Sequence, residues 1–327
     1  MNSKINGINS NGTGSTGSAE TNIFSNRLFA AAIAIFCCIL WGSATPAIKT
    51  AYTLFQIPSD DIMSRFLLAG VRFAGAGIII IAYGSISAGK FIHPSKETQP
   101  LIMKLGMVQT VFQYVFFYTG LAHTTGIKSA VLSATSTFFA IIISAMFRLE
   151  KLDAKKVSGC AVGLLGVIII NLNGSRFGPL NFAGDGAILI NAVANALAAV
   201  LIKKYSAREN PVVLTGYQFL FGGLILALAG LVGGGKLSAV GPSAWLLMFY
   251  MMLLSSAAYT LWTVLLKYNS VSEITIFSFC TPVFGVLLSA LLLKETNTFS
   301  PLQCAVSLIL VSAGILTVNL KGKTSVK

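Results

Sequence analysis

The chain has 327 residues, of which 55% are hydrophobic and only 10% are charged. Soluble domains carry about 25% charged residues. So few charges could not solvate a surface in water, and the composition therefore excludes a soluble enzyme or a soluble binding module and predicts that lipid covers most of the molecule.

Residues 1–26 are rich in Asn, Gly, Ser and Thr without periodicity, which predicts a disordered tail. Ten charge-free runs follow, and each reaches the ~17–25 residues that a spanning helix needs. We therefore predict an all-α integral membrane protein with ten transmembrane helices, followed by a short tail at 322–327. The runs are 28–48, 73–89, 105–127, 129–147, 157–175, 186–202, 210–235, 237–266, 274–293 and 296–320.

The second half of the chain repeats the first. At an offset of 145, Tyr114 matches Tyr259 and Glu150 matches Glu295, and several further segments match in nearly the same register. We expect a first five-helix repeat at 27–176 and a second at 177–321. Because each repeat has an odd number of helices, the second must enter the membrane from the opposite side. Inverted repeats are common among secondary transporters, with the substrate site between the halves.

The net charge of +13 follows the expected topology and is not read as a nucleic-acid surface. Of the 23 Lys and Arg residues, Arg65 and Arg72 fall on the second predicted helix. With the N-terminus inside, the outside segments hold only Lys49, Lys128, Arg176, Lys236 and Lys294, and the other sixteen are inside. This excess predicts a multi-pass protein of the plasma or inner membrane with both termini in the cytoplasm.

Polar and amphipathic residues recur at helical spacing on repeat-related helices, which predicts a cavity for a small amphipathic solute. The alternative is that hydroxyls bond their own helix carbonyls and aromatic rings only fill space. The candidate substrate-binding residues are Trp41, Gln113, Tyr114, Ser136, Asn195, Tyr259, Trp262 and Thr281.

The positions of the acidic residues limit the possible mechanisms. No Asp or Glu lies in the middle of a predicted span, and Glu150 and Glu295 lie at helix ends, where we expect them to act as anchors. This disfavours a carboxylate proton relay and a membrane-embedded hydrolase, so no enzyme activity is expected. Arg72 is the deepest cation, either a structural anchor or a partner for an anionic group of the solute.

Two prolines and five cysteines lie inside predicted spans. Pro46 and Pro282 each remove a backbone hydrogen bond, so we expect helix breaks that shape a cavity, or bends that only serve packing. The cysteines form no CxxC pair and have no histidine cluster beside them. The sequence therefore predicts no metal site and no cofactor.

Three motifs resemble EamA-type proteins of the drug/metabolite transporter superfamily. LWGSATPAIK (40–49) resembles their first helix, and RFLLAGVRFAGAGIII (65–80) resembles their second, with Arg72 at the usual arginine. CTPVF…LLLKE (280–295) resembles their ninth. The first repeat departs from the pattern, because Thr137 stands where a proline is usual. The resemblance implies ten helices in two inverted repeats around a central path, and export of amino acids or related metabolites.

We therefore expect an exporter of small amphipathic metabolites, such as amino acids, that works by alternating access. The alternatives are a sugar-phosphate or nucleotide-sugar exchanger, which would need several cations in its cavity, and a non-transporting membrane sensor or assembly partner. The expected partners are a small-molecule substrate and the lipid bilayer, with a homodimer allowed and no nucleic acid.

Overall fold

The computed structural model describes residues 23–124, 126–171, 181–293 and 301–319, and every element in these ranges is helical. Nine helical stretches in this part of the chain are long and apolar enough to cross a membrane. The 18-residue α7 is a further helix beside α13. The α-helices are α1 (Arg27–Leu54), α2 (Ile62–Ala88), α3 (Gln99–Gly106), α4 (Gln113–His123), α5 (Gly126–Ala134), α6 (Ser136–Met146), α7 (Ala154–Asn171), α8 (Phe182–Tyr205), α9 (Pro211–Val232), α10 (Pro242–Tyr268), α11 (Val271–Thr275), α12 (Cys280–Leu293) and α13 (Pro301–Asn319).

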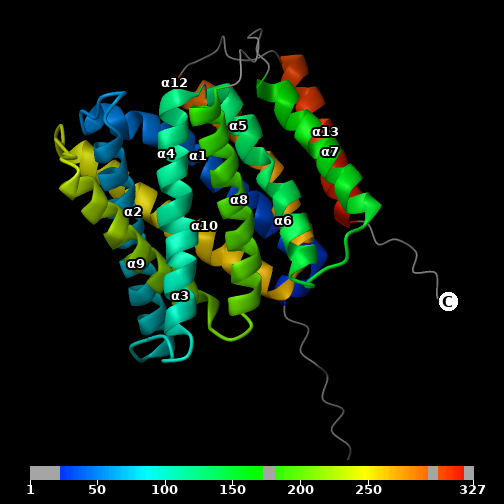
Figure 1. Cartoon of the computed structure of the whole chain (residues 1–327), viewed down its shortest axis with the longest axis horizontal. Coiled ribbons are helices and arrows are strands. Elements are labelled where there is room, and N and C mark those ends of the chain that lie inside the picture. The colour runs from blue at the N-terminus through cyan, green and yellow to red at the C-terminus, as the bar shows by residue number, and fades with distance from the viewer. Residues whose placement is uncertain (1–22, 125, 172–180, 294–300, 320–327) are drawn as a thin grey trace, which may run out of the picture.

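Two helix pairs flank the bundle (Figure 1). The α2–α9 pair forms one side and the α7–α13 pair the other, with α1, α4, α6, α8, α10 and α12 between them. Both pairs pack closely through glycine. A Cβ at Gly223 would lie 2.3 Å from the backbone N of Ala74, and one at Gly314 would lie 2.6 Å from the carbonyl O of Gly159. Small residues at such positions let membrane helices approach each other closely.

Polar caps fix where the helices begin. The side chain of Asn26 accepts hydrogen bonds from the backbone N–H groups of Leu28 and Phe29, and Asn181 caps α8 in the same way. We call the end of the bundle where α1 begins and α13 ends the terminal face, and the opposite end the far face. A guanidinium N–H of Arg27 donates to the carbonyl of Asn319 at 2.9 Å across the terminal face.

The last residues of the segment expected to be a tail are helical. Residues Ile23–Ser25 form a short 3₁₀ helix, η1, and the ring of Phe24 stacks on that of Tyr268 with centroids 6.3 Å apart. Asn269 donates to the carbonyl of Phe24, so this segment is held to α10. Residues 1–22 and 322–327, and the expected repeat boundary at 176–177, lie outside the described residues.

Three spans contain irregular turns. A π-helical stretch, η2 (Met107–Phe112), joins α3 to α4, and Thr135 separates α5 from α6. A 3₁₀ stretch, η3 (Ile276–Phe279), joins α11 to α12. Pro282 lies within α12, so the change of helix type precedes it. At Pro46 the expected break is absent, because α1 runs without interruption past it.

Candidate functional site

A cavity of about 480 Å³ opens inside the bundle, and both halves of the chain line it. The lining comes from α1, η2, α4, α5, α6, α8, α10, η3 and α12. These elements include the interrupted spans, which are places where a membrane helix can turn polar groups towards a solute. The lining residues are Trp41, Thr45, Lys49, Gln109, Gln113, Phe117, Leu121, Ser129, Ala130, Ser133, Ala134, Ser136, Asn195, Ala199, Ile202, Tyr259, Trp262, Ser278, Thr281 and Pro282.

Seven of the eight candidate substrate-binding residues lie on this cavity. They are Trp41, Gln113, Ser136, Asn195, Tyr259, Trp262 and Thr281, and Pro282 lies beside them. Tyr114 is the exception. A residue next to Gln113 lies about 100° further round the helix, and the ring of Tyr114 packs on Phe73 of α2 with centroids 4.6 Å apart. Its hydroxyl meets that of Tyr259 at 3.0 Å, so Tyr114 stands behind the cavity wall.

Aromatic rings form the deeper wall. The ring of Trp41 meets Tyr259 at 5.1 Å and Trp262 at 4.8 Å between centroids, in both cases edge to face. A smaller hollow of about 50 Å³ continues behind these rings towards Ala140 and Thr275. Aromatic surfaces of this kind offer a solute large apolar contact with few side-chain torsions to order.

Hydrogen-bonding groups are also available at the wall. The indole N–H of Trp41 and the side-chain oxygen of Gln113 are buried and have no hydrogen-bond partner within the described part of the chain. Nδ2 of Asn195 donates to the hydroxyl of Ser136 at 3.4 Å. Buried polar atoms normally find a partner, so an indole donor and an amide acceptor on one cavity favour a solute that carries both acceptors and donors.

Charge is sparse in the cavity. Among its described lining residues, Lys49 is the one charged side chain, and it lies near the far-face end of α1. Arg72 does not line the cavity. It is 4% exposed, its Nε donates to the hydroxyl of Ser255 at 2.8 Å, and its guanidinium lies 4.8 Å from the ring centroid of Phe73. This position favours the structural anchor over the anion-binding alternative.

Sequence reasoning left some lining residues out of the candidate set. The cavity is also lined by residues outside that set, among them Lys49, Gln109, Phe117, Leu121 and Ser129. Helical spacing contains a signal for several of them, because the lining follows every fourth residue through 41, 45 and 49 on α1 and through 109, 113, 117 and 121 on the third span. Following these series for one or two turns from Trp41 and Gln113 would have found Lys49, Gln109, Phe117 and Leu121, but not Ser129.

Comparison with known proteins agrees with this architecture. The model of the EamA-like transporter family matches the chain twice, over residues 28–172 and 182–320. The chain belongs to the EamA-like transporter family. As a member of this family with many apolar helices, it is a multi-pass membrane protein and a transporter of small molecules.

Individual relatives carry the same description. An uncharacterized inner membrane transporter of Escherichia coli, YedA, is 30% identical over 281 residues, covering 82% of this chain and 84% of YedA. An uncharacterized transporter of Archaeoglobus fulgidus is 27% identical over 265 residues, covering 79% of this chain and 88% of the relative. One solved crystal structure superposes with a TM-score of 0.74 at 20% identity, covering 89% of this chain and 98% of that one, and this likeness shows the fold alone.

Proposed function

We propose that this EamA-family protein transports small amphipathic metabolites, such as amino acids, by alternating access through the cavity between its two halves. The observation that carries the proposal is the lining itself. Rings of Trp41, Tyr259 and Trp262 stand beside neutral amide and hydroxyl groups in a space of about 480 Å³. Such a wall suits a solute that is partly apolar and partly hydrogen-bonding.

The two halves are proposed to be inverted five-helix repeats at 27–176 and 177–321. The double match of the family model and the meeting of Tyr114 with its sequence counterpart Tyr259 support this division. The excess of Lys and Arg at the terminal face supports a cytoplasmic location for that face. We propose export as the direction, on the strength of the family resemblance.

The cavity favours neutral or zwitterionic solutes over sugar phosphates. A phosphate dianion at membrane depth calls for several cations, and the described lining offers Lys49 alone. A homodimer stays a prediction from the sequence.

Flux into proteoliposomes tests the proposal. Radiolabelled amino acids should move faster than in protein-free vesicles, and sugar phosphates should not. Trp41→Ala should lower the apparent affinity roughly tenfold or more, because a Trp that a bound solute covers is a typical dominant contact. Tyr83→Ala, at a 70% exposed aromatic of α2, is the matched control and should transport normally.

Two other results would decide against the proposal. Flux of sugar phosphates alone would favour the exchanger. Absence of flux for every solute, with folded protein in the vesicles, would favour the sensor or assembly partner.

A further inference from the structure

The cavity is accessible from one end only. Along α1, Trp41 is half-buried, whereas Thr45 and Lys49, nearer the far face, are exposed. Along α8, which runs the other way, Asn195 is half-buried, whereas Ala199 and Ile202, nearer the terminal face, are buried. The cavity therefore opens to the far face and is closed towards the terminal face.

Two interrupted spans meet where the cavity closes. The hydroxyl of Thr137 on α6 donates to the carbonyl of Thr275 at 3.2 Å and lies 3.0 Å from the hydroxyl of Ser278 on η3. Towards the far face, their continuations α5 and α12 line the cavity instead. Towards the terminal face, α6 and α11 stay in contact. Closure is thus a junction between α6 of the first half and α11 of the second.

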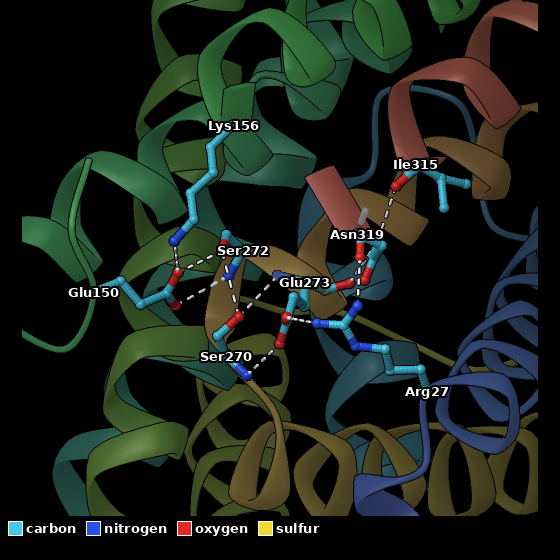
Figure 2. Close-up of polar contacts among 8 residues, drawn as sticks. All are labelled: Arg27, Glu150, Lys156, Ser270, Ser272, Glu273, Ile315 and Asn319. Atoms are coloured by element: carbon cyan, nitrogen blue, oxygen red, sulfur yellow. Dashed lines mark hydrogen bonds and ion pairs between the residues drawn. The ribbon is translucent and has the colours of Figure 1, made fainter. Parts of the chain in front are cut away.

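The carboxylate of Glu150 ties this junction together at the terminal face (Figure 2). Glu150 follows α6, and one of its oxygens accepts the backbone N–H of Ser272 at 3.1 Å while the other accepts the hydroxyl of the same serine. Lys156 of α7 donates to the carboxylate at 2.6 Å. Ser272 is fully buried, and the Glu150 side chain is 9% exposed. Hydrogen bonds to a buried charge are stronger than neutral ones.

The neighbouring polar contacts are weaker candidates for holding this end shut. Arg27 lies 3.6 Å from Glu273, but its side chain is 48% exposed, and exposed ion pairs contribute little. Lys203 donates to the carbonyls of Lys267 and Asn269, which are both in the second half with it. Within the described residues, Glu150 is the buried carboxylate that joins the two sides of the closure.

The carboxylate stays ionised at neutral pH. Burial raises the pKa of Glu150, but hydrogen bonds from Lys156 and Ser272 outweigh it and hold the pKa below its usual 4.5. Protonation would therefore weaken these contacts only as the pH falls below the usual range of a glutamate, so they are intact throughout the physiological range.

We propose that the contact between Glu150 and Ser272 holds the terminal face closed, and that transport opens this face by separating the two residues. We call this contact the latch, and the closed junction between α6 and α11 the gate. This rests on the proposed alternating access. Lys156 lies in the same half as Glu150, so it stays paired with the carboxylate when Ser272 leaves. A charge that keeps one partner in both states avoids the cost of an unpaired buried ion. The open state is therefore not made inaccessible by an unpaired Glu150 carboxylate.

Distances across the gate test the latch without any solute. Spin labels at Leu152→Cys and Tyr268→Cys, both exposed, flank the junction in a full-length chain whose five native cysteines are replaced by alanine. Pulsed electron double resonance in nanodiscs should show one short distance for the parent. In Glu150→Ala the ratio of a longer to the short distance should rise at least about tenfold, since bonds to a charged group are lost.

Two further variants make the result decisive. Ser272→Ala removes one donor with little risk to folding and should shift the ratio in the same direction, to a smaller extent. Asp153→Asn removes a charge from the same loop but keeps the side-chain oxygen that accepts the backbone N–H of Lys155 at the start of α7, and it should leave the distances unchanged. Unchanged distances in both Glu150→Ala and Ser272→Ala, or an equal shift in Asp153→Asn, would overturn the latch. If the parent protein transports solute but neither Glu150→Ala nor Ser272→Ala changes the distances, the transport proposal stands and only the latch is rejected.

Discussion

At the residue scale, the meeting of Tyr114 and Tyr259 separates packing from recognition. The two hydroxyls lie 3.0 Å apart, and only Tyr259 lines the cavity. Because the Tyr259 hydroxyl already forms a hydrogen bond with the Tyr114 hydroxyl, it can form fewer hydrogen bonds with a solute. Its ring, stacked edge to face with Trp41, is the part that the cavity presents. The pair therefore acts first as a polar contact between the helices behind the wall.

A double-mutant cycle measures this contact. Tyr114→Phe should cost about 1 kcal/mol of stability, because it leaves the Tyr259 hydroxyl without its partner. The double variant Tyr114→Phe with Tyr259→Phe should be more stable than the sum of the single effects implies. Thermal unfolding in detergent gives these values. Additive losses would show that the hydroxyls do not interact.

At the element scale, the positions of the spans were predictable from the sequence and the irregular turns were not. Hydrophobic runs placed eight of the nine spans within about six residues of their observed bounds, because a bilayer fixes the length that a helix needs. The second span is the exception: α2 begins at Ile62, well before the charge-free run 73–89, because it carries the buried Arg65 and Arg72. Spacing along those spans brought Trp41, Asn195 and Trp262 to one cavity. The π-helical stretch Met107–Phe112 contains neither Gly nor Pro, so no residue within it predicts a change of helix type. The break expected at Pro46 is absent, since neighbouring helices can support a continuous helix through a proline.

The glycine contact between α2 and α9 carries the element-scale prediction. A Cβ at Gly223 would lie 2.3 Å from the backbone N of Ala74, and backbone cannot swing aside as a side chain can. We expect Gly223→Ala to destabilise the protein by roughly 1–3 kcal/mol through overpacking. Gly186→Ala on α8 is the matched control, because a Cβ there meets nothing within 4 Å.

The control should be neutral or slightly stabilising, since alanine favours helix over glycine by up to about 1 kcal/mol. Thermal melting of the two variants side by side gives the comparison. Equal melting temperatures would mean that the α2–α9 pair can separate without cost, and would remove the reason for glycine at this contact.

At the whole-molecule scale, the two faces of the bundle differ in what they expose. The far face gives access to the cavity beside the exposed Thr45 and Lys49, while polar contacts close the terminal face. If the terminal face is cytoplasmic, as the distribution of Lys and Arg predicts, this arrangement is an outward-open state. The distribution of Lys and Arg and the direction in which the cavity opens are independent observations. Together they predict that a solute reaches the cavity from outside the cell.

Labelling from each side of the membrane tests that orientation. Single cysteines at Lys155 near the terminal face and at Ser243 near the far face, both exposed, are placed in the chain without its native cysteines. In intact cells an impermeant thiol reagent should label Ser243→Cys and should label Lys155→Cys only after the membrane is opened. The reversed pattern would place the cavity mouth in the cytoplasm. Labelling of both from outside would exclude an odd number of spans between the two sites, because residues 155 and 243 would then share one side of the membrane.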